Sequence, residues 1–585
     1  MSECTKPPVA RPLSPVIMAI LALGLGLFTG CGAAVFRWLI GFVHNLAFLG
    51  RWSFHYNTSL FTDPSPWGVG VILVPMIGGL IVTFLIVNFA PEARGHGVPE
   101  VMDAIFYKKG VIRPVVAAVK SMASAIAIGT GAAVGREGPI IQIGSAFGST
   151  LGQVLRMAPD QRIVLVAAGA GGGIAATFNT PIGGVMFALE LMMPEISLAT
   201  FLPVAIATGA ATYVGRALLG NGPAFYVPSL PPMASNLHMF GELFLFVLLG
   251  VVIGLACGVF VRGLYISEKI FERVKNSYVR HMIGMLAMGL LIYGFFVLAG
   301  HYYVQGVGYA MIQALLTGQL APHLGIWAFA GLLGLFFLAK LFATCVCLGS
   351  GSSGGIFSPS LFMGASLGAL LAIILHLLHL IPGSEIISFA IVGMAAMVAG
   401  GTGAAMTGVT MIFEMTRDYS IIIPMIIAVA VTLGVRRLVT TETLYTIKLV
   451  NRGDFIPSAL HANLFLVRRA NTIMNCDFQI VSDTTPVTTV VGTGPVLLSK
   501  DGAIHAVLPF IPQSGGKSLA DMASPNFIMV QPKESSRAVI QAMWRAGAVM
   551  AIVSTGPRCE DIQGVITKEQ VADSVANNVL GYRTA

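Results

Sequence analysis

Long apolar segments follow one another along most of the chain. Residues 14–36 contain no charged side chain, and residues 386–413 form a run of 28 positions without one. A helix needs roughly 20 apolar residues to cross a bilayer, whereas the strands of a membrane barrel would be short segments of alternating polarity. The pattern therefore predicts an all-α polytopic membrane protein.

Charged residues become more frequent near residue 451. The chain is 55% hydrophobic and 10% charged, against about 25% charged in a typical soluble protein. Of its 60 charged residues, 21 lie in positions 451–585. We expect an N-terminal segment over 1–14, a transmembrane domain over 15–450 and a small soluble domain over 453–585. A single soluble enzyme is excluded.

The basic residues do not indicate nucleic-acid binding. The net charge is +8, but no dense stripe of Lys and Arg and no basic patch spaced by aromatic residues occurs. Basic residues near the ends of membrane segments report topology instead, because cytoplasmic loops carry the excess of Lys and Arg. We therefore expect no nucleic-acid partner.

An internal repeat divides the membrane domain. Residues 131–148 and 351–368 agree at five Gly or Pro positions at a constant offset of 220. We predict two repeated halves, roughly 15–220 and 235–450. The matched pairs are Gly131/Gly351, Gly135/Gly355, Pro139/Pro359, Gly144/Gly364 and Gly148/Gly368, followed at an offset of 224 by Gly184/Gly408 and Glu190/Glu414.

The repeated Gly-to-Pro pattern places a flexible loop ahead of a helix, since Pro is favoured in the first helical turn. The N–H groups at a helix N-terminus have no partner inside the helix and attract anions. Two such termini that meet inside the membrane predict a site for a small anion. Close packing of helices is the alternative use of glycine. We assign that use to Gly144, Gly148, Gly364 and Gly368.

Three of these motifs carry a resemblance to a known family. The segments GREGP at 135–139, GGIFSP at 354–359 and GHGVP at 95–99 resemble the anion-binding signatures of CLC chloride channels and chloride/proton antiporters. Tyr445 is similar to the family's fourth contact, a tyrosine just after the last membrane helix. The resemblance covers roughly residues 15–450. It implies an inverted-repeat fold with broken helices and a homodimer with one chloride pathway per subunit.

The resemblance also implies roles for individual residues. Glu137 looks like the gating glutamate, whose carboxylate competes with the anion and whose protonation links pH to conduction. The alternative is a buried acid that pairs with Arg136. The implied anion-binding positions are His96, Gly97, Gly138, Gly355, Ile356, Phe357 and Tyr445, with Arg136, Lys120 and Glu190 in supporting positions.

The first motif departs from the family pattern at His96, where a Ser is usual. A neutral imidazole still donates one N–H, and a protonated one adds a positive charge. His96 would then change anion selectivity or make transport depend on pH. Alternatively, its ring turns aside into packing while the backbone of Gly95 and Gly97 binds the anion. Both interpretations stay open.

The sequence also departs from the family pattern along the expected proton route. Antiporters of the family usually carry two adjacent acids, the second being the inner proton acceptor, but here Glu190 is followed by Leu191. A leucine cannot carry a proton, which favours a channel or a weakly coupled transporter. A chloride/proton antiporter with another internal proton route is the alternative. We expect Glu190 and its counterpart Glu414 to cap or pack equivalent helices.

Residues 453–585 look like a small α/β module of two CBS repeats. Such pairs can bind adenine nucleotides in this family, but Gln570 stands where an acid is expected. A packing and dimerisation module without ligand is therefore favoured. The first repeat looks shorter than usual, because the interval from Pro486 to Pro509 leaves little room for its helix. Residues 478–481 and 551–553 are short β-type runs, 535–546 has helical spacing, and 564–567 resembles the closing strand of the second repeat. Residues 471–474 with 478–481, and residues 519–522 with 527–530, look like the openings of the two repeats.

These features predict transport without covalent chemistry. An intramembrane enzyme built on Glu137 and His96 would lack a metal-ligand motif such as HExxH. No cofactor is required, apart from a weakly supported adenine nucleotide at the CBS pair. The expected partners are chloride or a related anion, protons, the lipid bilayer and a second copy. We expect a multi-pass protein of the bacterial inner membrane with a cytoplasmic C-terminal domain.

Overall fold

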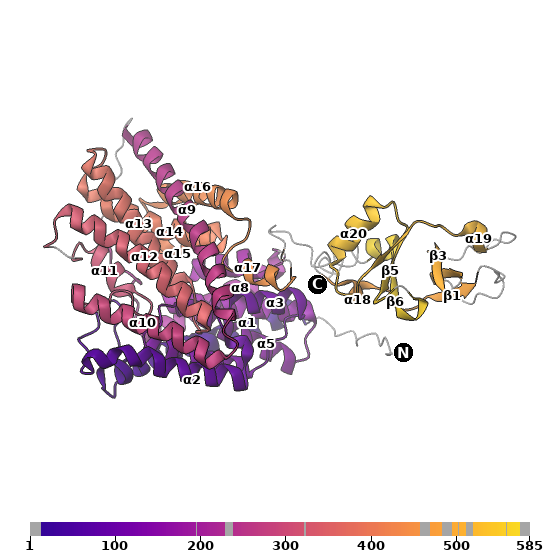
Figure 1. Cartoon of the computed structure of the whole chain (residues 1–585), viewed down its shortest axis with the longest axis horizontal. Helices are drawn as coiled ribbons and strands as arrows, with labels where there is room; N and C mark the ends of the chain where they lie inside the picture. Colours follow the sequence, from indigo (N-terminus) through magenta and orange to yellow (C-terminus); the bar gives the residue numbers. More distant parts are fainter. Residues whose placement is uncertain are drawn as a thin grey trace. The chain divides into compact units, whose positions relative to one another are not determined.

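A computed structural model divides the chain into two compact units, Arg11–Phe455 and a smaller unit that contains Ile456–Ala585. Each unit is described by itself (Figure 1). Most of the predicted N-terminal segment 1–14 lies outside the described residues. The structure describes residues 13–194, 196–228, 238–320, 323–454, 456, 468–482, 494–500, 502–509, 519–556 and 558–573.

The larger unit is helical and consists of two series of eight helices. The first series is α1 (Pro15–Leu49), α2 (Leu73–Phe89), α3 (Val98–Tyr107), α4 (Val115–Gly129), α5 (Glu137–Val154), α6 (Pro159–Phe178), α7 (Pro181–Phe187) and α8 (Leu198–Leu219). The second is α9 (His238–Glu272), α10 (Ser277–Ala299), α11 (Tyr309–Leu316), α12 (Ile326–Ser350), α13 (Phe357–Leu377), α14 (Ile386–Thr402), α15 (Ala405–Thr416) and α16 (Ile422–Val439). A short helix, α17 (Thr446–Asn451), follows.

The two series match in order and in packing. In the first, α5 packs on α6 and α1 on α8; in the second, α13 packs on α14 and α9 on α16. Within the part of the chain that the structure describes, nine helices are long and apolar enough to cross a membrane. The unit is therefore built from two repeated halves, and several of its helices are too short to span.

One predicted segment is not a single helix. The apolar run 386–413 is divided between α14 and α15. Gly403 ends α14 with a φ of 84° and Ala404 follows in an extended conformation. The apolar run shows only that the segment is buried, whereas the left-handed conformation at Gly403 ends the helix. The expectation that this 28-residue run forms one membrane-spanning helix is therefore wrong.

The glycines that we assigned to packing lie at close helix crossings. A Cβ on Gly144 would collide with the carbonyl oxygen of Gly169, and one on Gly364 would collide with that of Gly393. Gly148 and Gly368 face the backbone of Leu165 and Phe389 in the same way. Because small residues let membrane helices approach closely, these positions hold α5 on α6 and α13 on α14.

The smaller unit contains two sheets of the same topology. The first sheet is β1 (Gln479–Ser482), β2 (Val496–Lys500) and β3 (Ala503–Leu508); the second is β4 (Phe527–Val530), β5 (Met550–Ser554) and β6 (Ile562–Thr567). In each sheet the first pair of strands is parallel and the second antiparallel. The helices are α18 (Ala470–Ile473), α19 (Leu519–Met522) and α20 (Ser536–Arg545).

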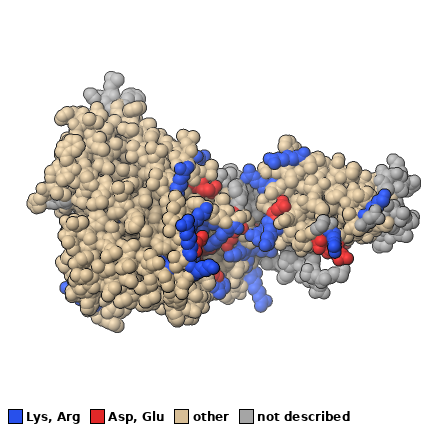
Figure 2. Space-filling view, viewed as in Figure 1, with Lys and Arg blue, Asp and Glu red and all other residues tan. Residues whose placement is uncertain are grey.

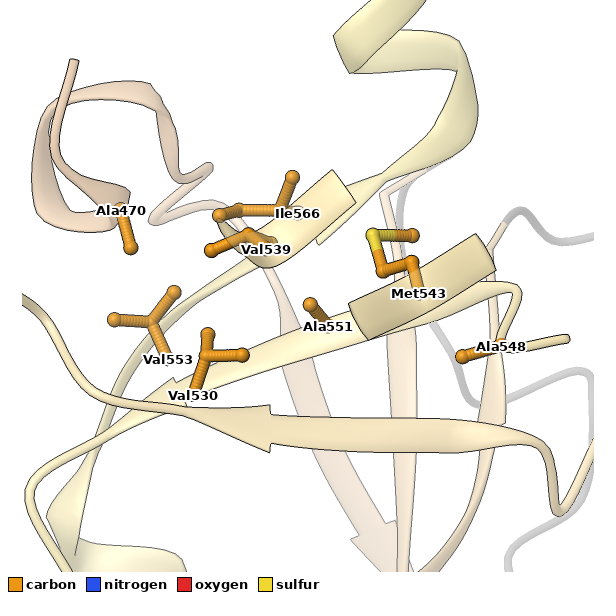
Figure 3. Close-up of a cluster of buried hydrophobic side chains, with 8 residues drawn as sticks. All are labelled: Ala470, Val530, Val539, Met543, Ala548, Ala551, Val553 and Ile566. Carbon is orange, nitrogen blue, oxygen red and sulfur yellow. The ribbon is translucent and has the colours of Figure 1, made fainter. Parts of the chain in front are cut away.

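Buried side chains join these elements. Leu497 and Val507 of the first sheet cluster with Met550, Ile552 and Val565 of the second. A second cluster lies between the second sheet and α20 (Figure 3); it contains Ala470, Val530, Val539, Met543, Ala548, Ala551, Val553 and Ile566. The strands and helices predicted for the tail are thus present within one or two residues. Of the 486–509 interval, residues 486–493 and 501 lie outside the described residues, and most of the rest forms β2 and β3.

Candidate anion pathway

The two repeated loops meet at a pair of matched glycines. The N–H of Gly135 donates to the carbonyl of Gly355 at 2.7 Å, and the N–H of Gly355 donates back to Gly135 at 2.6 Å. This antiparallel bridge brings together the N-termini of α5 and α13, as the repeat predicts. The third loop joins them, because Gly95 N–H donates to Ser352 and Gly354 N–H donates to Gly95.

The close approach of these loops is possible because glycine has no side chain. A Cβ on Gly355 would lie 2.7 Å from the backbone nitrogen of Gly138. Gly97 has a φ of 83° where it opens α3, a conformation that favours glycine. The structure thus brings the predicted positions Gly97, Gly138 and Gly355 into one region, where backbone N–H groups lie close together.

Glu137 lies at the N-terminus of the opposite repeat's helix. Its carboxylate is fully buried and accepts the N–H of Ser358, in the first turn of α13, at 3.3 Å. It also accepts the Ser358 hydroxyl and, at 2.5 Å, the Tyr309 hydroxyl. The Glu137 side chain therefore occupies three hydrogen-bond donors, two from the first turn of α13 and one from Tyr309 at the start of α11.

Arg136 does not neutralise Glu137. Within the described part of the chain, Arg136 forms no ion pair. Its buried guanidinium instead lies 5.8 Å from the ring centre of Phe178 and 5.2 Å from that of Tyr309. The alternative that Glu137 is a buried acid paired with Arg136 is therefore wrong.

Ile356 and Phe357 are buried at the start of α13. Backbone N–H groups in the first turn of a helix have no acceptor within it. The Phe357 ring packs against Phe178 with ring centres 5.7 Å apart. Tyr445, just before α17, is 2% exposed. The N–H groups of Ile356 and Phe357 thus lie next to the Ser358 N–H that Glu137 accepts.

His96 is 1% exposed, and its ring centre lies 5.8 Å from that of Tyr445. Neither ring nitrogen has a hydrogen-bond partner among the described residues. A buried polar group without a partner is costly. The imidazole thus has unused hydrogen-bonding capacity beside a residue of the predicted pathway.

Two buried lysines support the loops in matching ways. Lys120 donates to the carbonyls of Ala93 and Gly95 at 2.9 and 2.7 Å. Lys340, which is 220 positions later, donates to Val304 and Gly306 at 2.9 and 2.7 Å. Each lysine holds the loop that precedes a short helix, α3 or α11. Lys120 therefore shapes the loop that leads into α3.

Glu190 and Glu414 cap each other's helices, as their repeat positions predict. Glu190 accepts the N–H groups of Met406 and Thr407, at 3.1 and 2.9 Å, at the start of α15. Glu414 accepts those of Ile182 and Gly183, at 3.1 and 2.7 Å, at the start of α7. Because its oxygens are engaged in this way, Glu190 has a structural role.

A charged network lies beside a large cavity of the membrane unit. Glu100 of α3 pairs with Lys448 of α17 at 2.9 Å and with Arg452 at 3.0 Å. The cavity measures about 870 Å³. Figure 2 shows that charged side chains gather along one edge of this unit. Those lining the cavity are Arg94, Lys108, Lys269, Arg280, Lys448, Arg452, Glu92, Glu100, Glu268 and Glu272.

We expect the Glu100→Gln variant to unfold at a lower temperature than the wild type. Burial raises the pKa of Glu100, but the Lys448 and Arg452 charges outweigh it and hold the pKa at about 2, below the ordinary 4.5. A hydrogen bond to a charged group contributes about 1.5–3 kcal/mol. The stabilisation is complete above pH 4.5 and is lost as the pH falls towards 2. Thermal unfolding in detergent at pH 7 and pH 3 checks this.

Glu92→Gln is the matched control, since its pair with Arg113 has side chains 36% and 53% exposed and such pairs contribute little. Equal losses of stability in both variants would contradict the role of Glu100. So would a pH dependence that Glu100→Gln leaves unchanged.

Four residues of this site were missing from the sequence-based prediction: Tyr309, Ser358, Lys340 and Glu100. A finer comparison of the two halves contains a signal for two of them. Gly306, Gly308 and Tyr309 follow the spacing of Gly95, Gly97 and Val98 at an offset of 211, and Lys340 matches Lys120. Ser358 and Glu100 become visible only from their contacts.

Comparison with known proteins decides the family. The family model described as voltage gated chloride channel matches residues 78–437, more than half of the chain. The chain belongs to this family. Its members transport ions and are not enzymes. Membership of this family agrees with the helices, the loops and the motifs described above.

Relatives of this chain include two transporters named H(+)/Cl(-) exchange transporter ClcA. The one from Vibrio parahaemolyticus is 32% identical over 452 residues, which cover 75% of this chain and 90% of the relative. The one from Vibrio cholerae is 34% identical over 372 residues, 62% of this chain and 75% of the relative.

Solved structures show the same fold. A slow cyanobacterial Cl-/H+ antiporter matches with a TM-score of 0.63 and 24% identity, covering 76% of this chain and 99% of that one. A eukaryotic CLC transporter matches with a TM-score of 0.61 and 18% identity, covering 95% and 98%. At these identities the likeness concerns the fold alone.

Proposed function

We propose that this chain carries chloride or a similar small anion along a pathway in each subunit, with Glu137 as its gate. The observation that carries the proposal is the placement of the Glu137 carboxylate on the first-turn donors of α13. An anion that competes for these donors displaces the carboxylate. Protonation removes the negative charge and releases the side chain, so anion flux increases as pH falls.

A second anion-binding position, next to that of the Glu137 carboxylate, uses other hydrogen-bond donors of α13. The N–H groups of Ile356 and Phe357 hold the anion there, and the Tyr445 hydroxyl donates a further hydrogen bond. The buried position of Tyr445 and the open first turn of α13 support this arrangement. No covalent step and no cofactor are needed.

His96 donates a ring N–H to the anion at this second binding position. Its two unpartnered nitrogens beside Tyr445 support that role over simple packing. We expect His96→Ser to shift the chloride-to-nitrate flux ratio or the pH midpoint of flux, because a hydroxyl replaces an imidazole. Stopped-flow or electrode measurements on liposomes check this. If both quantities stay as in the wild type, the ring serves packing and the loop backbone binds the anion.

A further question is whether anion transport is coupled to proton transport. Leu191 stands where antiporters of the family usually carry an acid, and Glu190 is engaged as a helix cap. These observations favour a channel or a weakly coupled transporter. The second candidate is a chloride/proton exchanger with another proton route, and the names of the relatives favour it.

The reversal potential of the purified protein tests the function. In planar bilayers, a chloride gradient is crossed with a pH gradient. A potential that follows chloride alone establishes a channel, and one that pH also shifts establishes an exchanger. The absence of any anion-dependent current or flux would overturn the proposed function.

We further propose a homodimer in the bacterial inner membrane, with the α17 side and the C-terminal unit in the cytoplasm. The collection of Lys and Arg on one edge of the membrane unit supports this orientation, since basic residues concentrate on the cytoplasmic side. Cross-linking in membranes tests the dimer. Labelling of Cys559 by an impermeant thiol reagent in intact cells would contradict the orientation.

For the smaller unit we propose a CBS-like packing module without nucleotide. The repeated topology of its sheets supports the CBS resemblance. The side chain of Gln570 accepts the N–H of Thr567 at 3.2 Å, so the position where an acid is expected closes a local turn. Heat released on adding millimolar ATP to the full-length protein would contradict this proposal.

A further inference from the structure

A second, small cavity lies close to Glu137. It measures about 10 Å³, room for one species of about the size of a water molecule. It shares no lining residue with the large cavity. Its lining consists of Arg37, Ile40, Tyr56, Thr58, Ile128, Arg136, Gly306 and Val307.

Two guanidinium groups face this cavity without a counter-ion. Arg136 is 6% exposed, and its Nε and Nη1 have no hydrogen-bond partner among the described residues. Arg37 of α1 is close enough for the two like charges to repel each other. Neither arginine forms an ion pair with another described residue. A buried charge without a partner is costly, so the cavity favours a negative ion.

The position of the cavity relates it to the gate. Arg136 directly precedes Glu137, whose carboxylate is held by Ser358 and Tyr309 instead. Gly306 and Val307 form the loop that leads into α11 and Tyr309. The large cavity instead reaches Gly95, next to His96. The two cavities thus reach the Glu137–His96 region at different residues.

We propose that Arg37 and Arg136 form a further binding site for one small monovalent anion, at the mouth of the pathway opposite the large cavity. The anion binds between the two guanidinium groups, beside the Thr58 side chain, before it displaces the Glu137 carboxylate. This inference rests on the proposed anion transport and adds Arg37, a residue of the first helix, to the pathway.

Flux in membrane vesicles of defined orientation tests the site. We expect Arg37→Gln to raise the half-saturating chloride concentration on one side of the membrane by about tenfold, equivalent to about 1.4 kcal/mol. The opposite side should keep the wild-type value, because the large cavity is untouched. Arg37→Lys should retain most of the affinity, since it keeps the positive charge.

Arg51→Gln is the matched control, because Arg51 pairs with Asp63 at 3.6 Å and both side chains are about two-thirds exposed. It removes one positive charge near the end of α1 without touching the cavity. An equal effect of Arg51→Gln, an equal effect on both sides, or no effect of Arg37→Gln in a transporting protein would overturn the site. Loss of anion flux in the wild type would instead overturn the proposed function.

Bromide provides a direct readout that does not depend on flux. Crystals of the wild type grown with bromide should show an anomalous peak between Arg37 and Arg136, and crystals of Arg37→Gln should lack it. If Arg37→Gln does not fold, Thr58→Val takes its place, with a weaker peak expected. A wild-type cavity that holds only water would overturn the proposal.

Discussion

Anion flux through the Glu137→Gln variant should be independent of pH and faster than wild-type flux at neutral pH. The wild-type carboxylate occupies three donors at α13 and Tyr309, and only its protonation removes the charge that competes with the anion. The amide is neutral at every pH. Each hydrogen bond to a charged group contributes about 1.5–3 kcal/mol, so release of the gate corresponds to at least about tenfold in rate.

Chloride efflux from liposomes between pH 4.5 and 7.5 measures this effect. Glu92→Gln is the control, because Glu92 pairs with Arg113 at the protein surface. The control should keep the wild-type pH profile. A Glu137→Gln profile that still rises with acid would show that another group senses pH, and Glu137 would then be a structural residue.

The second large effect is expected for Tyr309→Phe. The Tyr309 hydroxyl donates to the Glu137 carboxylate at 2.5 Å and contacts the Ser358 hydroxyl at 2.7 Å. Loss of this donor weakens the hold on the charged carboxylate while the ring stays beside Arg136. The acidic midpoint of anion flux should therefore move up by about one pH unit, as a loss of 1.36 kcal/mol predicts. Ser358→Ala should move it in the same direction.

Other charged or titratable groups near Glu137 stay in place in this variant, namely Arg136, Lys340 and Tyr445. A shift in Tyr309→Phe is thus attributable to the lost hydroxyl. Tyr213→Phe is the control, since Tyr213 is 74% exposed on α8. A midpoint that stays or moves down in Tyr309→Phe would show that the hydroxyl does not stabilise the closed gate.

The sequence predicted much of the fold because membrane helices leave strong signals. Apolar runs of about 20 residues mark helices, since backbone polar groups must be satisfied within the segment. The spacing of Gly135 and Gly355 indicated a repeat, and the structure joins these two residues by mutual hydrogen bonds. The division at Gly403 was not predicted, because a run of apolar and small residues does not show where a buried helix ends.

The site was predicted only in part, for a related reason. Motif positions such as Glu137, Gly355 and Phe357 stand in recognisable local patterns. The contacts of Glu137 with Tyr309 and Ser358 cannot be read from such patterns, because these residues are 172 and 221 positions away along the chain. A hydroxyl in an apolar segment looks the same whether it bonds to its own helix or to a distant carboxylate.

The sequence by itself determined the class of this protein, the two repeated halves, the separate C-terminal unit and the glycine loops at helix N-termini. These features depend on hydrophobicity and on local backbone preference, which neighbouring residues along the chain set. Only the tertiary structure decided what faces each charge: that Glu137 is held by hydroxyls and not by Arg136, that Glu190 caps α15, and that Arg37 and Arg136 share a cavity. Such pairings depend on which distant segments the packed helices bring within a few ångströms.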